Sequence, residues 1–151
     1  MTALTLAVVM QVALAAPTDA PSPRGAQTYA AAYKQSQDEG QPLLVLVGAE
    51  WCPACRQMKQ DVMPQAVRQG VLDRVAFAQV NPDSEPGVAR QLMRGGSIPQ
   101  LVLYRKTEDG WKLTRRFVGA QSVDAIRSAV DSALAEQSQE SDTKLTGTVS
   151  E

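Results

Sequence analysis

An uninterrupted run of five apolar residues, 43–47, is the feature that most limits what this chain can fold into. A strand with one face in water alternates apolar and polar residues, whereas this run (Leu-Leu-Val-Leu-Val) has no polar position. It therefore predicts a strand at the centre of a sheet, buried on both faces. Helices must then cover both faces of that sheet, so we expect an α/β protein.

The remaining elements predicted along the chain agree with that architecture. Helices are expected over 26–36, from Cys55 past Val62 with a kink or break at Pro64, over 86–94, and after an N-cap at Ser122, and strands over 75–80, 100–105 and 111–118. This order of strands and helices predicts a mixed central sheet with helices on both faces.

The first residues of the chain read as a targeting segment. Residues 4–16 are apolar apart from Thr5 and Gln11, and such a run is shorter than the roughly 20 residues that span a bilayer. A small-x-small site at 13–15 predicts a signal peptide over residues 1–15 followed by a linker over 16–25. No Lys or Arg precedes the run, so a short uncleaved anchor and an amphipathic first helix remain alternatives. We expect an exported, periplasmic or otherwise extracytoplasmic protein.

The rest of the chain has room for one domain. With 151 residues in all, we expect a single folded unit over 26–135. The final stretch, 136–151, is mostly Gln, Ser, Glu, Asp, Thr and Lys, and it offers too little apolar surface to offset its ordering entropy. The composition therefore predicts a disordered tail over 136–151.

The composition also excludes several kinds of chemistry. The chain has no histidine, which removes Ser-His and Cys-His nucleophile pairs and histidine-ligated metals. The net charge is −1 with acidic and basic residues interspersed, so no nucleic-acid partner is expected. Carboxylates, Lys, Tyr or the two cysteines must carry any reaction.

Both cysteines lie in one short segment, Cys52-Pro53-Ala54-Cys55, directly after the buried strand and at the start of a helix. Two sulfur atoms in the first turn of a helix are close enough to form a disulfide. The helix dipole and free backbone N–H groups favour a thiolate at Cys52, so we expect Cys52 to be the exposed nucleophile. Cys55 is expected to be the buried, resolving thiol that releases a mixed disulfide.

Two other interpretations of the cysteine pair remain open. A purely structural disulfide is possible, although so short a ring constrains the unfolded chain very little. Half of a zinc site is the other, but with no histidine and no further cysteine the chain cannot complete a tetrahedral site alone. We expect no metal and no cofactor besides the Cys52–Cys55 disulfide itself.

Three segments resemble the thioredoxin family: 49–55, which contains Trp51 and both cysteines, Ser97-Ile98-Pro99, and 117–120 with its glycine. The resemblance covers about residues 26–135 and implies a thioredoxin fold. It also implies that Trp51 flanks the nucleophile and that a cis Ile98–Pro99 bond faces the disulfide. The backbone of Ile98 would then pair with an extended substrate segment.

The chain departs from the family pattern near the cysteines. Leu46 stands where thioredoxins usually carry a buried Asp, so no acid at that position can assist proton transfer at Cys55. Glu50 is near in sequence and is either a solvated residue or a proton relay. Pro53-Ala54 replaces the family's usual Gly-Pro, a pair that helps to set the redox potential, and the following helix lacks the early kinking proline.

The resemblance implies a thiol–disulfide oxidoreductase that acts on protein thiols and disulfides in cell redox homeostasis. We expect a monomer that a separate redox partner recharges, without a membrane span beyond a possible N-terminal anchor. Reduction, oxidation and isomerisation of substrate disulfides all remain open. The alternative is a non-catalytic binding module that keeps the fold and presents the Pro99 loop to a partner.

Overall fold

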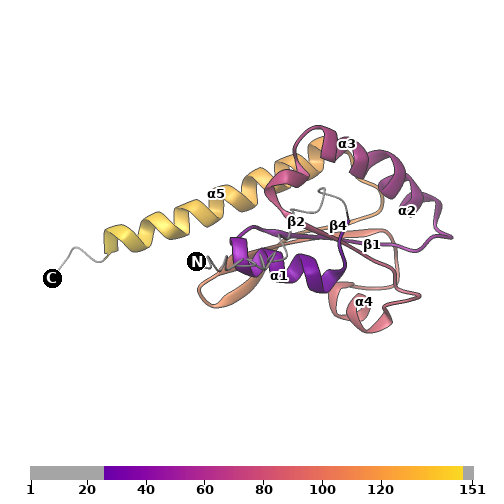
Figure 1. Ribbon diagram of the computed structural model, residues 1–151, viewed down its shortest axis with the longest axis horizontal. Coiled ribbons are helices and arrows are strands. Elements are labelled where there is room, and N and C mark those ends of the chain that lie inside the picture. The colour runs from indigo at the N-terminus through magenta and orange to yellow at the C-terminus, as the bar shows by residue number, and fades with distance from the viewer. Residues whose placement is uncertain (1–25, 148–151) are drawn as a thin grey trace, which may run out of the picture.

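The computed structural model describes residues 26–147, and the expected signal peptide and linker lie outside the described residues (Figure 1). The elements, in chain order, are α1 (Tyr29–Glu39), β1 (Leu43–Val47), α2 (Pro53–Gln57), the π-helical turn η1 (Met58–Val62), α3 (Met63–Arg68), the short 3₁₀ helix η2 (Leu72–Arg74), β2 (Ala76–Val80), α4 (Pro86–Leu92), β3 (Gln100–Thr107), β4 (Gly110–Val118) and α5 (Val123–Gly147). This order confirms the predicted α/β architecture.

The four strands form one mixed sheet in the order β2-β1-β3-β4. Strand β1 runs parallel to β2 and antiparallel to β3, and β3 and β4 form an antiparallel hairpin. All five residues of β1 are buried, which confirms the central strand predicted from its sequence. The fold class predicted for this chain is therefore correct.

Helices cover both faces of the sheet. In Figure 1, α2, α3 and α5 lie on one side of the sheet, and α1 and α4 lie on the other. Residues of β1 alternate between the two resulting cores: Leu44 and Leu46 pack with Met58 and Ile126 on the first side. On the second side, Leu43, Val45 and Val47 pack with residues of α1 and α4. The uninterrupted apolar run is needed because both faces of β1 are buried.

Helix α1 starts later than predicted. Gln27 was expected to be helical, but it forms a bridge with Ala78 on the outer edge of β2. Its backbone N–H donates to Phe77 O at 3.2 Å, and its carbonyl accepts from Gln79 N at 3.3 Å. Thr28 then caps the helix, because its Oγ1 accepts from Ala31 N at 3.2 Å. A tertiary contact thus moves the start of the helix by about one turn.

The helix after the cysteines passes through Pro64 without a break. Residues 53–68 are helical throughout, and the π turn η1 lies just before the proline. There Met63 N donates to Met58 O, five residues back, so the turn is wider than an α-helical turn. A proline ring would collide with the preceding turn of a regular helix, and the wider turn gives it room. The predicted kink or break at Pro64 is replaced by this π turn.

Helix α5 begins as predicted, with Ala125 N donating to Ser122 Oγ at 3.2 Å, but it continues far beyond residue 135. The prediction of a disordered tail was wrong for residues 136–147, which are helical; 148–151 lie outside the described residues. Two carboxylates of the extension, Glu136 and Glu140, form ion pairs with the buried guanidinium of Arg105 on β3. These tertiary contacts hold the first part of the extension, Glu136 to Glu140, against β3.

No helix in the part of the chain that the structure describes is long and apolar enough to cross a membrane.

Candidate active site

The register of the sheet brings four segments to one end of the molecule. Val47, the last residue of β1, pairs with Val80 at the end of β2 and with Gln100 at the start of β3. Gln100 in turn pairs with Val118 at the end of β4. The cysteine segment, the loop after β2, the Pro99 loop and Gly119 therefore meet at the same edge of the sheet.

Cys52 and Cys55 form a disulfide at the start of α2, with their Cα atoms 5.2 Å apart. Cys55 is fully buried, and Cys52 is 6% exposed. Cys52 is thus the more accessible of the two, as predicted, but it is far less exposed than the sequence suggested. One reason is that the carbonyl oxygen of Ile98 lies over its Sγ, 3.8 Å away.

The backbone around the disulfide supports negative charge on Cys52. Cys52 is the N-cap of α2, and the backbone N–H of Cys55 donates to its Sγ at 3.2 Å. Arg56 N closes the first turn by donating to Cys52 O at 3.0 Å. A backbone N–H directed at sulfur stabilises a thiolate more than a thiol, because hydrogen bonds to ionised acceptors are stronger. Pro53 occupies the first helical turn, where its missing N–H costs nothing.

The Ile98–Pro99 bond is cis and faces the disulfide, as the family resemblance implied. Ile98 is partly exposed and Pro99 is buried. Pro99 O accepts from the backbone N–H of Gly119 at 2.8 Å, so the end of β4 holds the loop. The glycine has a φ of 87°, in the left-handed region that favours glycine.

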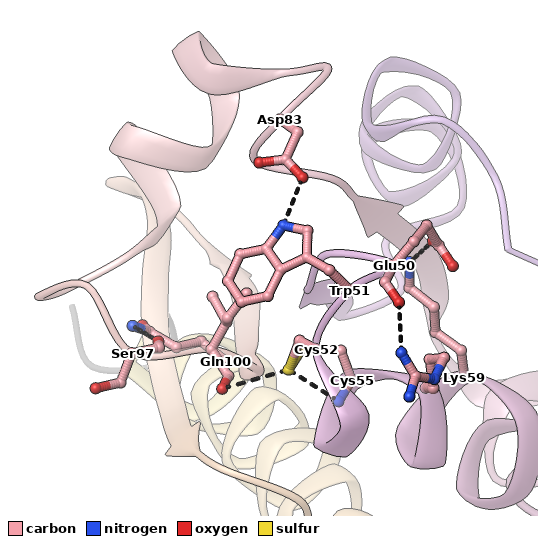
Figure 2. The surroundings of a disulfide bond; sticks show 10 residues. Glu50, Trp51, Cys52, Cys55, Lys59, Asp83, Ser97 and Gln100 are labelled. Carbon is pink, nitrogen blue, oxygen red and sulfur yellow. Dashed lines mark hydrogen bonds and ion pairs between the residues drawn. A yellow bond between two sulfur atoms is a disulfide. The ribbon is translucent and has the colours of Figure 1, made fainter.

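Trp51 lies beside the disulfide with 66% of its surface exposed. Its Nε1 donates to the carboxylate of Asp83 at 2.9 Å, so the ring is held at one edge, as Figure 2 shows. Asp83 was not singled out from the sequence. A signal existed, since it follows β2 at the edge where the parallel strand β1 also ends.

Glu50 is turned toward Lys59 (Figure 2). Its carboxylate forms an ion pair with the Lys59 ammonium, and its backbone carbonyl accepts from Arg56 NH1 at 3.0 Å. The Glu50 side chain is exposed, whereas that of Lys59 is mostly buried. This arrangement fits the solvated-residue interpretation of Glu50 better than a proton relay.

Leu46 is fully buried in the first core and packs with Met58 and Leu101, so it presents no polar group to the site. Gly48, two residues later, was not anticipated. A Cβ on Gly48 would lie 3.0 Å from both Cβ and Sγ of Cys55. The resolving position predicted for Cys55 is therefore packed directly against backbone. A glycine just after the central strand and shortly before the cysteines was the available signal.

Within the described residues, no group of three or more His, Cys, Asp or Glu side chains could hold a metal ion. The arrangement can perform thiol–disulfide exchange, which requires two adjacent sulfurs, one of them more accessible, and a surface beside them.

Known proteins with similar structures include several thioredoxins. The thioredoxin of Thermus thermophilus superposes with a TM-score of 0.60 at 23% identity, covering 72% of this chain and 85% of that one. Trxlp of Edwardsiella tarda matches with a TM-score of 0.54 at 29% identity, over 70% of this chain and 96% of its own. The thioredoxin of Fasciola hepatica matches with a TM-score of 0.53 at 25% identity, over 70% and 94% of the two chains.

The sequence profile described as thioredoxin-like matches residues 25–106, which is more than half of the chain. That range contains the central strand, the cysteine pair and the Pro99 loop. The fold and the Cys52–Cys55 disulfide support thiol–disulfide oxidoreductase chemistry in general. By this match the chain belongs to the thioredoxin-like family.

Proposed function

We propose that this chain is an exported thiol–disulfide oxidoreductase that exchanges its Cys52–Cys55 pair with protein substrates. The observation that carries the proposal is the position of Cys52 Sγ, between the first turn of α2 and the Ile98 carbonyl 3.8 Å away. A substrate segment lying along Ile98 would bring its own sulfur next to Cys52.

In the reducing direction, the Cys52 thiolate attacks one sulfur of a substrate disulfide. A Cys52–substrate disulfide forms, and the other substrate sulfur leaves as a thiolate and takes up a proton. The Cys55 N–H that points at Cys52 Sγ stabilises the attacking thiolate.

Cys55 then loses its proton and attacks Cys52 Sγ. The Cys52–Cys55 disulfide forms and the second substrate thiol is released, so two electrons pass from the protein to the substrate. Oxidation of a substrate dithiol is the same sequence reversed. In either direction a separate redox partner must recharge the pair, because the protein's own disulfide is its only redox group in this proposal.

The surroundings of Cys52 support a protein substrate over a small one. Trp51 offers an exposed aromatic ring beside the sulfur, and the partly exposed Ile98 places its carbonyl over that sulfur. An extended peptide can contact both at once. The apolar segment 1–15 supports the export part of the proposal, and the protein is proposed to act as a monomer without nucleic-acid partners.

Titration of the full chain in glutathione redox buffers tests the redox couple. We expect a reversible two-electron transition between the dithiol and the disulfide. In the same preparation, Cys55→Ser should accumulate mixed disulfides with disulfide-bonded insulin on non-reducing gels, because the Cys52 thiolate attacks an insulin disulfide and the resolving thiol is missing. Cys52→Ser is the matched control and should accumulate almost none.

A protein that shows no reversible couple, yet retains its partners when both cysteines are replaced by serine, would be a binding module instead. Export is tested separately by fractionating bacteria that express the full chain or a chain without residues 2–15. The full chain should leave the cytoplasm, and retention of both chains inside would reject the export part alone.

A further inference from the structure

The loop that carries Ile98 has no regular secondary structure and contains two glycines. It runs from Met93, the C-cap of α4, to Pro99, just before β3, and it contains Gly95 and Gly96. Residues 94–97 are all exposed. No other part of the protein lies close to the side-chain position of either glycine: a Cβ added at Gly95 or Gly96 would meet nothing within 4 Å. Packing alone therefore does little to hold this loop.

A single buried side chain bonds to the loop instead. Gln100, the first residue of β3, is fully buried. Its Nε2 donates to Arg94 O at 2.8 Å and to Ser97 O at 2.9 Å, and its Oε1 accepts from Arg94 N at 3.1 Å. Within the described residues, these three bonds are the hydrogen bonds that join the backbone of residues 94–97 to the rest of the protein.

Arg116 on β4 completes the set. Its NH1 donates to Gln100 Oε1 at 2.8 Å and to Leu92 O, at the end of α4, at 2.6 Å. The Gln100 amide thus uses both of its N–H donors and accepts two hydrogen bonds at its oxygen, which is the full capacity of the group. A buried amide with every bond made has one favoured orientation, because any rotation leaves a polar group unpaired.

We propose that Gln100 is a positioning residue for substrate recognition: its amide fixes the loop that presents Ile98 to a substrate beside Cys52. This inference rests on the proposed function. Ile98 lies between the last bonded loop residue, Ser97, and the buried Pro99, so the bond to Ser97 O and the Pro99–Gly119 bond hold it from both sides. Arg116 supports the amide and acts one step further from the substrate.

The proposal predicts a selective defect. A protein or peptide disulfide uses the backbone at Ile98 as well as the sulfur of Cys52, whereas DTNB, a small aromatic disulfide, needs only an accessible thiolate. Loss of the Gln100 hydrogen bonds should weaken binding of a protein or peptide disulfide and leave the rate of reaction with DTNB unchanged. It should also leave the equilibrium constant with glutathione unchanged, because none of the side-chain hydrogen bonds of Gln100 is made to a cysteine.

The experiment compares the wild-type chain with Gln100→Leu, Gln100→Glu and Arg116→Met, and uses Gln65→Leu on the exposed face of α3 as the control. Gln100→Leu should raise KM for insulin about tenfold, while kcat and the DTNB rate stay within about twofold. Gln100→Glu keeps the acceptor for Arg94 N and Arg116 but loses both donors, so it should fall between wild type and leucine. Arg116→Met should have a smaller effect, and Gln65→Leu none.

Hydrogen exchange of the Arg94 amide gives a readout that does not depend on activity, because this amide donates to Gln100 Oε1. Its exchange should accelerate in Gln100→Leu, and less in Gln100→Glu, which keeps the acceptor, while amides of β1 remain protected. If Gln100→Leu does not fold, Gln100→Glu carries the same comparison.

Equal losses toward insulin and DTNB would reduce Gln100 to a structural residue and overturn the proposal. Unchanged KM for insulin with faster loop exchange would overturn it as well, since the loop would then be dispensable for recognition. A wild-type chain that reduces neither probe would reject the proposed function itself, and the positioning role with it, whatever the exchange data show.

Discussion

The two sides of the disulfide are built in different ways. On the cysteine side, the contacts that shape the site join residues close together in the sequence: Cys55 N bonds to Cys52 Sγ, and Arg56 N bonds to Cys52 O. On the proline side, the loop depends on Gln100, the first residue of β3, and on Gly119, which directly follows β4.

The difference explains which half of the site a sequence reveals. A strand, a turn and a helix start are local features, and each leaves a local pattern. The Pro99 loop owes its orientation to partners that only the strand register brings close. We therefore expect variants that displace a cysteine to affect the chemistry toward every substrate. Variants that alter the Pro99 loop or the exposed Trp51 ring should affect mainly protein substrates.

Gly48→Ala should have the largest effect, because a Cβ there would lie 3.0 Å from both Cβ and Sγ of Cys55. The neighbouring backbone or Cys55 must shift, and we expect a loss of about 1–3 kcal/mol in unfolding free energy. Displacing the resolving thiol should slow exchange with insulin and DTNB alike by about tenfold. Urea denaturation and steady-state rates measure the two effects.

Gly87→Ala in α4 is the matched control, since a Cβ there meets nothing within 4 Å. It should leave the rates unchanged and stabilise the helix slightly. A Gly48→Ala variant as active as Gly87→Ala would show that Cys55 does not depend on close packing against this glycine.

Gly119→Ala should produce the next largest effect, confined to the proline side. A residue with a side chain is strained at a φ of 87°, although the space around Gly119 is open. We therefore expect the free energy of unfolding to fall by about 1–2 kcal/mol. The strain acts on the bond to Pro99 O, and KM for insulin should rise several-fold while the DTNB rate is kept.

Gly40→Ala is the control that tests whether backbone strain alone produces this effect. Gly40 also has a positive φ, 69°, and open space around it, but it lies at the end of α1 and not beside Pro99. It should cost similar stability without changing KM. Identical kinetic changes in the two variants would remove the distinction drawn between the two sides of the site.

Asp83→Ala should have a smaller effect, since it frees the indole of Trp51, which is already 66% exposed. We expect KM for insulin to rise about twofold, because an exposed hydrogen bond contributes only about 1 kcal/mol or less. Tryptophan fluorescence in a Trp111→Phe background would report the change at Trp51 alone. Asp83→Asn keeps an acceptor and should behave like the wild type; an effect of Asp83→Ala on DTNB of the same size would contradict a role in substrate contact.

Arg105→Met should leave exchange unchanged while lowering stability. Glu136 and Glu140 are both partly exposed, so water can solvate their carboxylates when the arginine is removed. We therefore expect the free energy of unfolding to fall by only about 1–2 kcal/mol, and circular dichroism should show a shorter α5. A change in either exchange rate would mean that α5 is coupled to the site.

The same ion pairs set the pH range in which this contribution persists. The hydrogen bond to Glu140 raises the pKa of Arg105 above its usual value. A raised pKa means that the stabilising contribution of this arginine is present below its unfolded-state pKa and is lost only as the pH rises through the folded value. Titration of Arg105 should therefore not change stability near neutral pH, and Arg105→Lys should retain part of the contribution.

The sequence alone was sufficient for the central strand, the helix cap at Ser122 and the position of the cysteine pair. Each depends on residues that are neighbours in the chain: five apolar residues in a row, a serine at a helix start, and two cysteines in one turn. The early start predicted for α1 and the disordered tail predicted after residue 135 were wrong because both segments depend on residues that are distant in the chain. Gln27 is held by β2, and Glu136 and Glu140 at the start of the extension are paired with Arg105.

What the sequence determined by itself was the kind of fold and the chemistry available, because hydrophobic periodicity and the Cys-x-x-Cys spacing act over a few residues. The tertiary structure alone decided which groups surround the sulfurs. Gly48 is pressed against Cys55, Asp83 holds Trp51, and Gln100 holds the loop before Pro99. Hydrogen bonds and close packing reach only a few ångströms, so their partners are defined once the strand register has brought distant segments to one edge of the sheet.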